Sequence, residues 1–131
     1  MSITASPIAL GPAIPVLRIF DLAKAREFYC DFLRFSWDWQ HQFAPDLPVF
    51  AQVSRAGLLL FLSEHHGDGT PGSLVMLRMR GLDALHAELS AQAYRHARPA
   101  IEPRPWGWRD LPVTDPFGNR LVFTEPMAEG T

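Results

Sequence analysis

Two segments of this chain recur about sixty residues apart. Residues 16–19 (VLRI) reappear at residues 76–79 (MLRM), and residues 60–64 (LFLSE) reappear at residues 121–125 (LVFTE). A repeat period close to half of a 131-residue chain predicts two copies of one supersecondary module. Paired modules of this kind are expected to enclose a cleft that holds a ligand. The repeat therefore directs both the fold prediction and the search for a site.

The hydrophobic pattern predicts a strand, a helix and three further strands in each half. Asp21 is a suitable N-cap for the first helix, and the second helix begins near Gly81. We expect one α+β domain over residues 1–131, with two tandem βαβββ modules forming curved mixed sheets around a cleft. The modules span about residues 12–64 and 73–126. The expected strands cover residues 13–20, 35–41, 49–54 and 58–63, then 74–79, 101–105, 111–114 and 121–123.

Composition excludes several classes of function. The formal net charge of −2 gives no electrostatic support for nucleic-acid binding. The single cysteine, Cys30, excludes an intrachain disulfide and is interpreted as a structural residue of the first helix. No apolar run reaches membrane-spanning length, and the N-terminus lacks the pattern of a secretory signal. A cytoplasmic protein with no membrane partner is therefore expected.

Two motifs stand out, residues 18–22 (RIFDL) near the first predicted helix and residues 115–120 (DPFGNR) near the C-terminus. They resemble motifs of the vicinal oxygen chelate superfamily, which includes glyoxalases, dioxygenases and bleomycin-resistance proteins. Residues 18–22 (RIFDL), followed by Phe28-Tyr29, resemble the first strand-to-helix junction of that superfamily. Residues 115–120 (DPFGNR) resemble its D-P-x-G-N signature near the C-terminus. The resemblance covers almost the whole chain and implies the glyoxalase/bleomycin-resistance fold.

Further segments resemble the bleomycin-binding resistance proteins of this superfamily. They are residues 15–17 (PVL), residues 80–85 (RGLDAL), the pair Phe50-Ala51, and Pro105-Trp106-Gly107. The resemblance implies that Trp106 and Phe50 are opposing surfaces that stack on a flat ligand. It also implies a homodimer, which would cover the sheet faces and edges that one copy leaves open.

The metalloenzymes of the superfamily carry His, Gln or Glu at four inward strand positions. In this chain the corresponding residues are Ile14, Phe61, Leu74 and Val122. Divalent cations require nitrogen, oxygen or sulfur donors, and these four side chains are hydrocarbons. We therefore expect no metal at the usual site and no other cofactor.

Aromatic residues are the better functional clue. The set comprises Trp37, Trp39, Phe43, Phe50, Phe61, Trp106 and Trp108. Strand alternation predicts that Trp37 and Trp39 share one face, and Trp106 and Trp108 are expected in a loop. Tryptophan offers a large recognition surface at little entropic cost. The predicted ligand-binding residues are Phe50 and Trp106 as stacking surfaces, with Phe61, Trp37 and Trp108 as floor or rim.

Polar residues at the ends of two equivalent strands leave alternatives open. Glu64 and Glu125 either attract a cationic ligand, and so belong to the predicted site, or are exposed strand ends. The neighbouring His65 and His66 belong either to a solvated loop or to the rim of the cleft. No pairing of a nucleophile with a base is recognisable.

The leading hypothesis is a non-catalytic protein that sequesters a planar, cationic small molecule in an aromatic cleft. The alternative is a glyoxalase-like enzyme that uses Glu64, Glu125 or a loop histidine for acid–base chemistry. A third hypothesis is a structural or regulatory domain whose cleft is filled by its own side chains.

Overall fold

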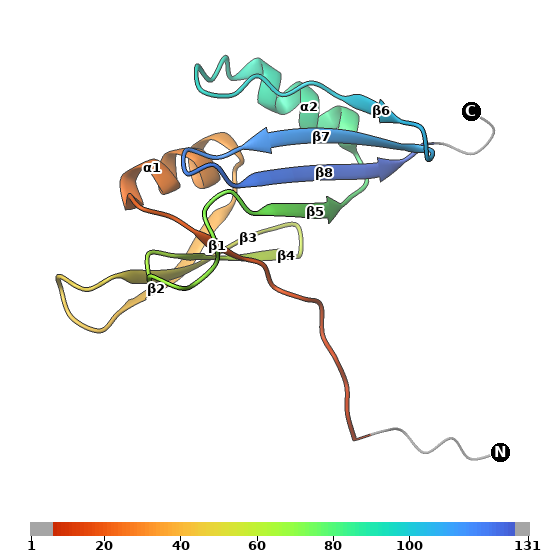
Figure 1. The fold of residues 1–131 in the computed structure, drawn as a ribbon. Helices are drawn as coiled ribbons and strands as arrows, with labels where there is room; N and C mark the ends of the chain where they lie inside the picture. Colours follow the sequence, from red (N-terminus) through yellow and green to blue (C-terminus); the bar gives the residue numbers. More distant parts are fainter. Residues whose placement is uncertain (1–6, 128–131) are drawn as a thin grey trace.

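The computed structural model describes residues 7–127, which form two four-stranded mixed sheets with helices packed against them (Figure 1). The first sheet has the strand order β1-β4-β3-β2, in which β1 is parallel to β4 and the other pairs are antiparallel. Helix α1 (Leu22–Arg26) continues directly into the π-helix η1 (Glu27–Phe32). The strands are β1 (Val16–Arg18), β2 (Ser36–Gln42), β3 (Val49–Arg55) and β4 (Leu58–Ser63).

The second sheet repeats this topology. Its order is β5-β8-β7-β6, again with one parallel pair, β5 with β8, and two antiparallel pairs. Helix α2 (Leu82–Ala91) follows its first strand. The predicted arrangement of two tandem βαβββ modules is therefore confirmed. Residues 1–6 and 128–131 of the expected domain lie outside the described residues. The strands are β5 (Leu74–Arg78), β6 (Glu102–Arg104), β7 (Trp108–Thr114) and β8 (Arg120–Pro126).

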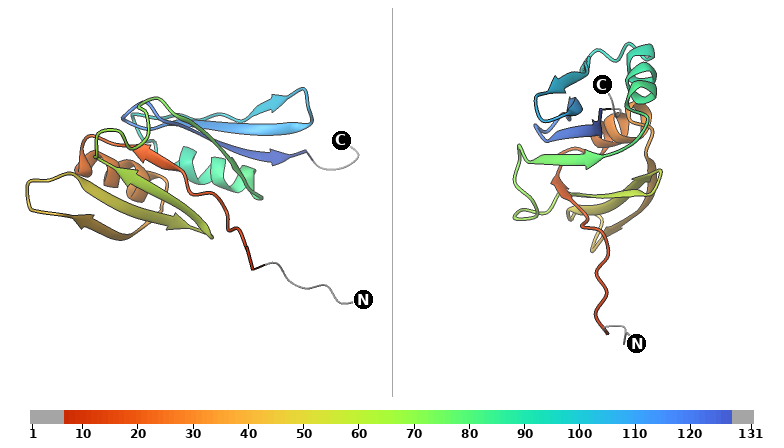
Figure 2. Two further views of the ribbon diagram at one scale, coloured as in Figure 1. Left: turned by 60° about the horizontal axis from the view of Figure 1, so that its bottom comes forward. Right: turned by 90° about the vertical axis from the view of Figure 1, so that its right-hand side faces the viewer.

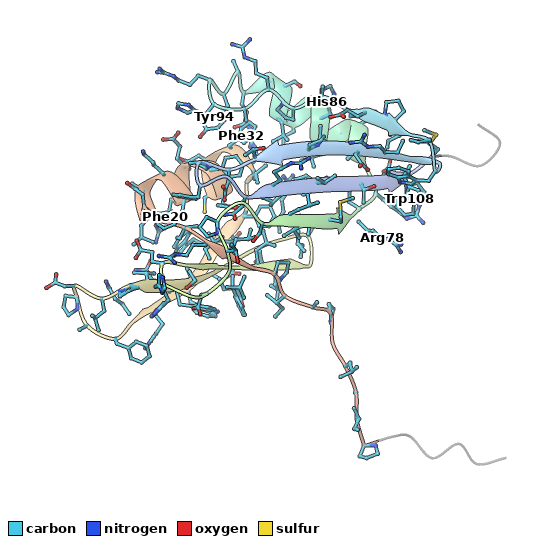
Figure 3. All side chains as sticks on the ribbon, in the orientation of Figure 1. Phe20, Phe32, Arg78, His86, Tyr94 and Trp108 are labelled. Carbon is cyan, nitrogen blue, oxygen red and sulfur yellow. The ribbon has the colours of Figure 1, made fainter. Side chains whose placement is uncertain are left out.

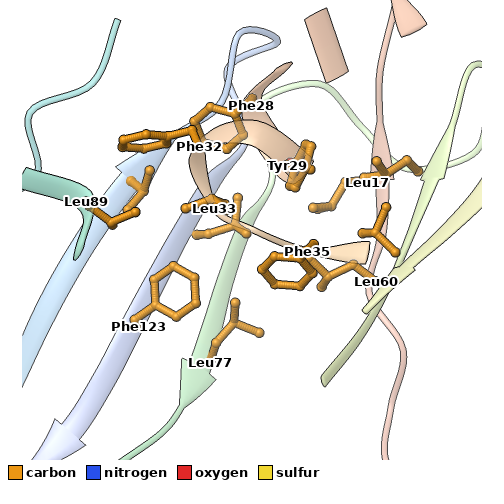
Figure 4. Packing of buried hydrophobic residues seen from close by; sticks show 14 of the residues in the cluster. Leu17, Phe28, Tyr29, Phe32, Leu33, Phe35, Leu60, Leu77, Leu89 and Phe123 are labelled. Atoms are coloured by element: carbon orange, nitrogen blue, oxygen red, sulfur yellow. The ribbon is translucent and has the colours of Figure 1, made fainter. Parts of the chain in front are cut away.

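One hydrophobic core joins the two modules. Figure 4 shows Leu17 and Leu60 of the first sheet and Leu77 and Phe123 of the second sheet, with helical residues such as Phe28 packed in the same core. Because strand side chains alternate between faces, each sheet turns its other face outward, away from this core. The outward faces are therefore the sheet surfaces available for binding.

The turn between β7 and β8 ties the second module to the first. The Asp115 carboxylate accepts hydrogen bonds from the amides of Phe117 (2.9 Å) and Asn119 (2.8 Å) and from the Asn119 side chain (2.9 Å). The buried Tyr29 hydroxyl donates a fourth bond over 2.6 Å. The Asn119 amide group also donates to the carbonyl of Arg18. The D-P-F-G-N motif is thus a structural clamp between modules.

The N-terminal arm, residues 7–15, leaves the body of the molecule in an extended course (Figures 1 and 2). Leu10 within it is 92% exposed. The arm leads into β1, which pairs with β4 of its own chain. No helix within residues 7–127 is long and apolar enough to cross a membrane.

Candidate functional site

Three aromatic rings lie together on the outward face of the first sheet. The Phe50 and Phe61 ring centroids are 5.0 Å apart, and the Trp39 ring lies 6.1 Å from Phe50 and 5.9 Å from Phe61. These separations are typical of aromatic clusters. Trp39 is 43% exposed, so the cluster offers flat apolar surface to solvent. We call Trp39, Phe50 and Phe61 the aromatic face.

A β-bulge in β2 brings Trp39 to this face. The pairing register shifts between the two tryptophans, so that Trp37 pairs with Val53 and Trp39 pairs with Gln52. Asp38 is the extra residue, and it places Trp37 and Trp39 on opposite sides of the sheet. The prediction that they share one face is therefore wrong.

Trp37 lies apart from the aromatic face, packed against the core. The Arg26 guanidinium is 4.1 Å from its ring centroid, and its Nε1 donates to the Gln40 side chain over 3.1 Å. The indole thus has packing and hydrogen-bonding partners within its own module, and its location does not support the predicted contact with ligand.

The outward face of the second sheet combines apolar and charged side chains. Figure 3 shows Arg78 and Trp108 at the same end of this sheet, and the Arg78 guanidinium lies 5.0 Å from the Trp108 ring centroid. Asp110 is only 3% exposed and accepts bonds from Thr124 (2.7 Å) and Arg104 (3.1 Å). Its charge is therefore compensated within the sheet.

The structure separates the two predicted stacking residues, Phe50 and Trp106. Trp106 occupies the turn between β6 and β7 and is 66% exposed, whereas Phe50 lies on the first sheet with Trp39 and Phe61 as ring neighbours. Gly107, at a φ of +87°, permits the tight turn that displays the indole. Trp108, expected in this loop, is instead the first residue of β7.

The two predicted site carboxylates bind the backbone of their own modules. Glu64 accepts the Val49 amide over 3.0 Å. Glu125 Oε2 accepts the amides of Gly81 (2.6 Å) and Leu82 (3.1 Å), and Oε1 accepts from Arg109 over 2.9 Å. Glu125 therefore caps helix α2, whose N-cap Gly81 has no side chain. Neither interaction points to a cationic ligand.

These contacts also control the charge of Glu125. Burial alone would raise the pKa of its carboxyl, but the Leu82 amide, the Arg109 guanidinium and the Gly81 amide outweigh burial and lower that pKa. A carboxyl group whose pKa lies below its usual value is a poor proton carrier near neutral pH.

Histidines beside the first carboxylate also have local partners. The His65 amide donates to the Ser63 hydroxyl over 3.0 Å, and its ring lies edge-on to Phe43, with ring centroids 6.4 Å apart. His66 follows in an exposed turn. These positions fit the solvated-loop interpretation and show no acid–base pair.

The residues at the superfamily's metal positions do not fit a metal ion. Phe61 and Val122 occupy equivalent sites on β4 and β8. Leu74, the first residue of β5, pairs with Arg120, two residues before Val122 on β8. Neither these side chains nor Ile14 has a nitrogen, oxygen or sulfur donor. Within residues 7–127, no group of three or more His, Cys, Asp or Glu side chains is placed to hold a metal.

Two repeated βαβββ modules with open sheet faces define the class of this protein. A family model described as "Glyoxalase superfamily protein" matches residues 2–130, so the chain belongs to the glyoxalase superfamily. A search of curated proteins finds no significant match.

Solved structures with this fold include both binding proteins and enzymes. The bleomycin-binding protein of bleomycin-producing Streptomyces verticillus, complexed with copper(II)-bleomycin, has 27% identity and a TM-score of 0.60, covering 93% of this chain and 99% of its own. Another bleomycin-binding protein, complexed with bleomycin, has 21% identity and a TM-score of 0.69, covering 88% and 98%. A glyoxalase-related enzyme from Clostridium phytofermentans has 19% identity and a TM-score of 0.72, covering 94% and 100%.

The sequence predicts Phe50 and Phe61 as site residues, but not Trp39. Strand alternation assigns Trp39, a member of the aromatic set, to the same face as Trp37. A β-bulge of one extra residue does not require a particular amino acid, so neither composition nor residue spacing indicates its position in the sequence. Simple alternation holds in β3 and β4, where the burial pattern places Phe50 and Phe61 on the same face of the sheet.

Proposed function

We propose that this protein binds a planar small molecule on the aromatic face and withholds it from its target without transforming it. The observation that carries the proposal is the cluster of Trp39, Phe50 and Phe61 on an outward sheet surface. Stacking contributes about 0.5–1.5 kcal/mol per aromatic pair beyond area burial. A bleomycin-like compound with a flat ring system is the ligand class that the relatives suggest.

The proposed binding cleft lies between two copies of the chain. One chain presents the aromatic face and the Trp106 turn on different sheets, both turned away from the shared core. A two-fold dimer would bring the first sheet of one copy against the second sheet of its partner. Exposed Leu74 and Met76 on the second sheet, and Leu10 in the arm, supply apolar surface for this association. Phe50 and Trp106 would then face each other as predicted.

Aromatic contact, rather than charge, supports this proposal. Glu64 and Glu125, for which attraction of a cationic ligand is one of two alternatives, bind backbone amides. The same contacts occupy the carboxylates that a glyoxalase-like enzyme would need for acid–base chemistry. The binding function therefore has the stronger structural support.

Calorimetric titration with metal-free bleomycin tests the proposal. We expect saturable binding to the wild-type protein. Trp39→Ala should weaken it by about 1–3 kcal/mol, the range for losing a stacked aromatic anchor. Phe20→Ala is the matched control, because Phe20 is also exposed but lies against Phe117, away from the aromatic face.

Two results would overturn the binding proposal. Unchanged affinity in Trp39→Ala would place the ligand elsewhere, and turnover of a bound compound would favour the enzyme alternative. Light scattering at micromolar concentration tests the dimer separately, since a monomer there would exclude the cleft between copies.

A further inference from the structure

A cavity of about 410 Å³ lies between the two modules, on the core side of the sheets. Its walls come from the end of η1, the β3–β4 hairpin, β5, β8 and α2. None of the three aromatic-face residues lines it. Its volume falls in the range of small-molecule sites. The apolar lining comprises Leu33, Phe35, Ala56, Leu58, Leu77, Met79, Ala84, Leu85 and Phe123.

An ion pair between the modules forms part of the cavity wall. Arg55, at the end of β3, donates two hydrogen bonds to the Glu88 carboxylate on α2, over 2.8 and 2.9 Å. It also donates to the carbonyl of Leu33 over 2.8 Å. Two of these bonds hold the hairpin against α2 and the third holds it against the end of η1, so this part of the cavity wall is fixed. The two charges compensate each other and leave no net charge there.

The remaining charges of the lining are positive. Arg78 and Arg80 both contribute to it, at the end of β5. The Arg78 guanidinium stacks over Trp108, whereas Arg80 is exposed and has no ion pair, hydrogen bond or ring contact with any other residue in 7–127. An apolar cavity beside an uncompensated guanidinium favours an occupant with an apolar body and one negative charge.

We propose that this cavity binds a monocarboxylic acid with an apolar body. The body packs among Leu77, Met79 and Phe123, and the carboxylate pairs with Arg80. Because the cavity walls belong to both modules, such a ligand stabilises their packing. This site is distinct from the aromatic face and does not depend on what binds there.

Titration with decanoate, compared with decanol and decylamine, tests the site. We expect one decanoate per chain, bound about threefold more tightly than decanol because it forms one ion pair with an exposed guanidinium. Decylamine should bind more weakly than either compound. Methyl-labelled methionine gives a local signal. The Met79 resonance should shift on binding, while Met76, on the outward face of β5, should not.

Three variants locate the contacts. Ala84→Phe introduces a bulky ring at the cavity wall and should weaken the binding of both decanoate and decanol. Arg80→Gln should weaken the binding of decanoate about threefold and leave the binding of decanol unchanged. Arg98→Gln is the matched control, because it removes the same charge from an exposed residue outside the lining.

Failure of wild-type protein to bind decanoate with one-to-one stoichiometry would overturn the proposal. A shift of Met76 without Met79, or equal loss of affinity in Arg80→Gln and Arg98→Gln, would do the same. The Met79 measurement on unmutated protein keeps the test valid if Ala84→Phe fails to fold.

Discussion

The buried hydroxyl of Tyr29 predicts a specific loss of stability on substitution by phenylalanine. The hydroxyl donates to the Asp115 carboxylate over 2.6 Å, and both side chains are almost fully buried. A hydrogen bond to a charged group contributes about 1.5–3 kcal/mol. Asp115 keeps its other donors in Tyr29→Phe, so the carboxylate is not left without partners. We therefore expect the lower end of this range, about 1.5–2 kcal/mol.

Urea-induced unfolding of wild-type and Tyr29→Phe proteins measures this loss directly. For a chain of this length, the same change lowers the melting temperature by roughly 5–10 °C. Tyr94→Phe is the matched control. Its hydroxyl donates to Glu27 over 3.0 Å in an exposed position, so its loss should change the free energy of unfolding by less than about 0.5 kcal/mol. Equal effects of the two substitutions would refute the assignment of the Tyr29–Asp115 bond as an inter-module clamp.

Removing the Glu125 cap with Glu125→Ala should lower the free energy of unfolding by about 1–2 kcal/mol, as measured in urea. Because the folded protein lowers the pKa of Glu125 below its usual 4.5, this stabilisation is present above about pH 4.5 and is lost as the pH falls through the folded-state pKa. Burial, followed by the Asp115 charge, raises the pKa of Tyr29 above its usual 10.0. Stability should therefore decline as the pH rises above about 10, and the decline should be shallower in Tyr29→Phe. Elemental analysis should find no transition metal bound one-to-one with the chain; a metal lost on mutation of Phe61 or Val122 would contradict this.

Most of the fold could be predicted from the internal repeat of the sequence. Residues 16–19 and 76–79 include β1 and the C-terminal part of β5. Residues 60–64 and 121–125 include the C-terminal part of β4 and most of β8. In both modules these strands form the parallel pair. The pattern recurs because the two modules bury equivalent strand positions in one core, and burial is what hydrophobic periodicity reports.

The site was harder to predict because its decisive features are not local in sequence. Glu125 and Gly81 lie far apart in the chain, so a helix cap supplied by a strand leaves no spacing motif. Trp108 is a local case: it joins β7 because Arg104 pairs with it across the β6–β7 hairpin, which residue preferences do not indicate. Backbone pairing and long-range contacts, rather than composition, decide these positions.

The bulge at Asp38 has a consequence for comparing this protein with its relatives. In a strand without the extra residue, the position equivalent to Trp39 directly follows the equivalent of Trp37. An ungapped alignment would therefore match Trp39 to a residue that faces the interior. Deleting the Asp38 codon would keep both indoles on their present sides, whereas deleting the codon of a regularly paired residue such as Gln40 would reverse the side chains between that point and the turn. Which face of the sheet an aligned aromatic residue of a relative occupies therefore depends on where the alignment places its gap, more than on whether the aromatic residue is retained.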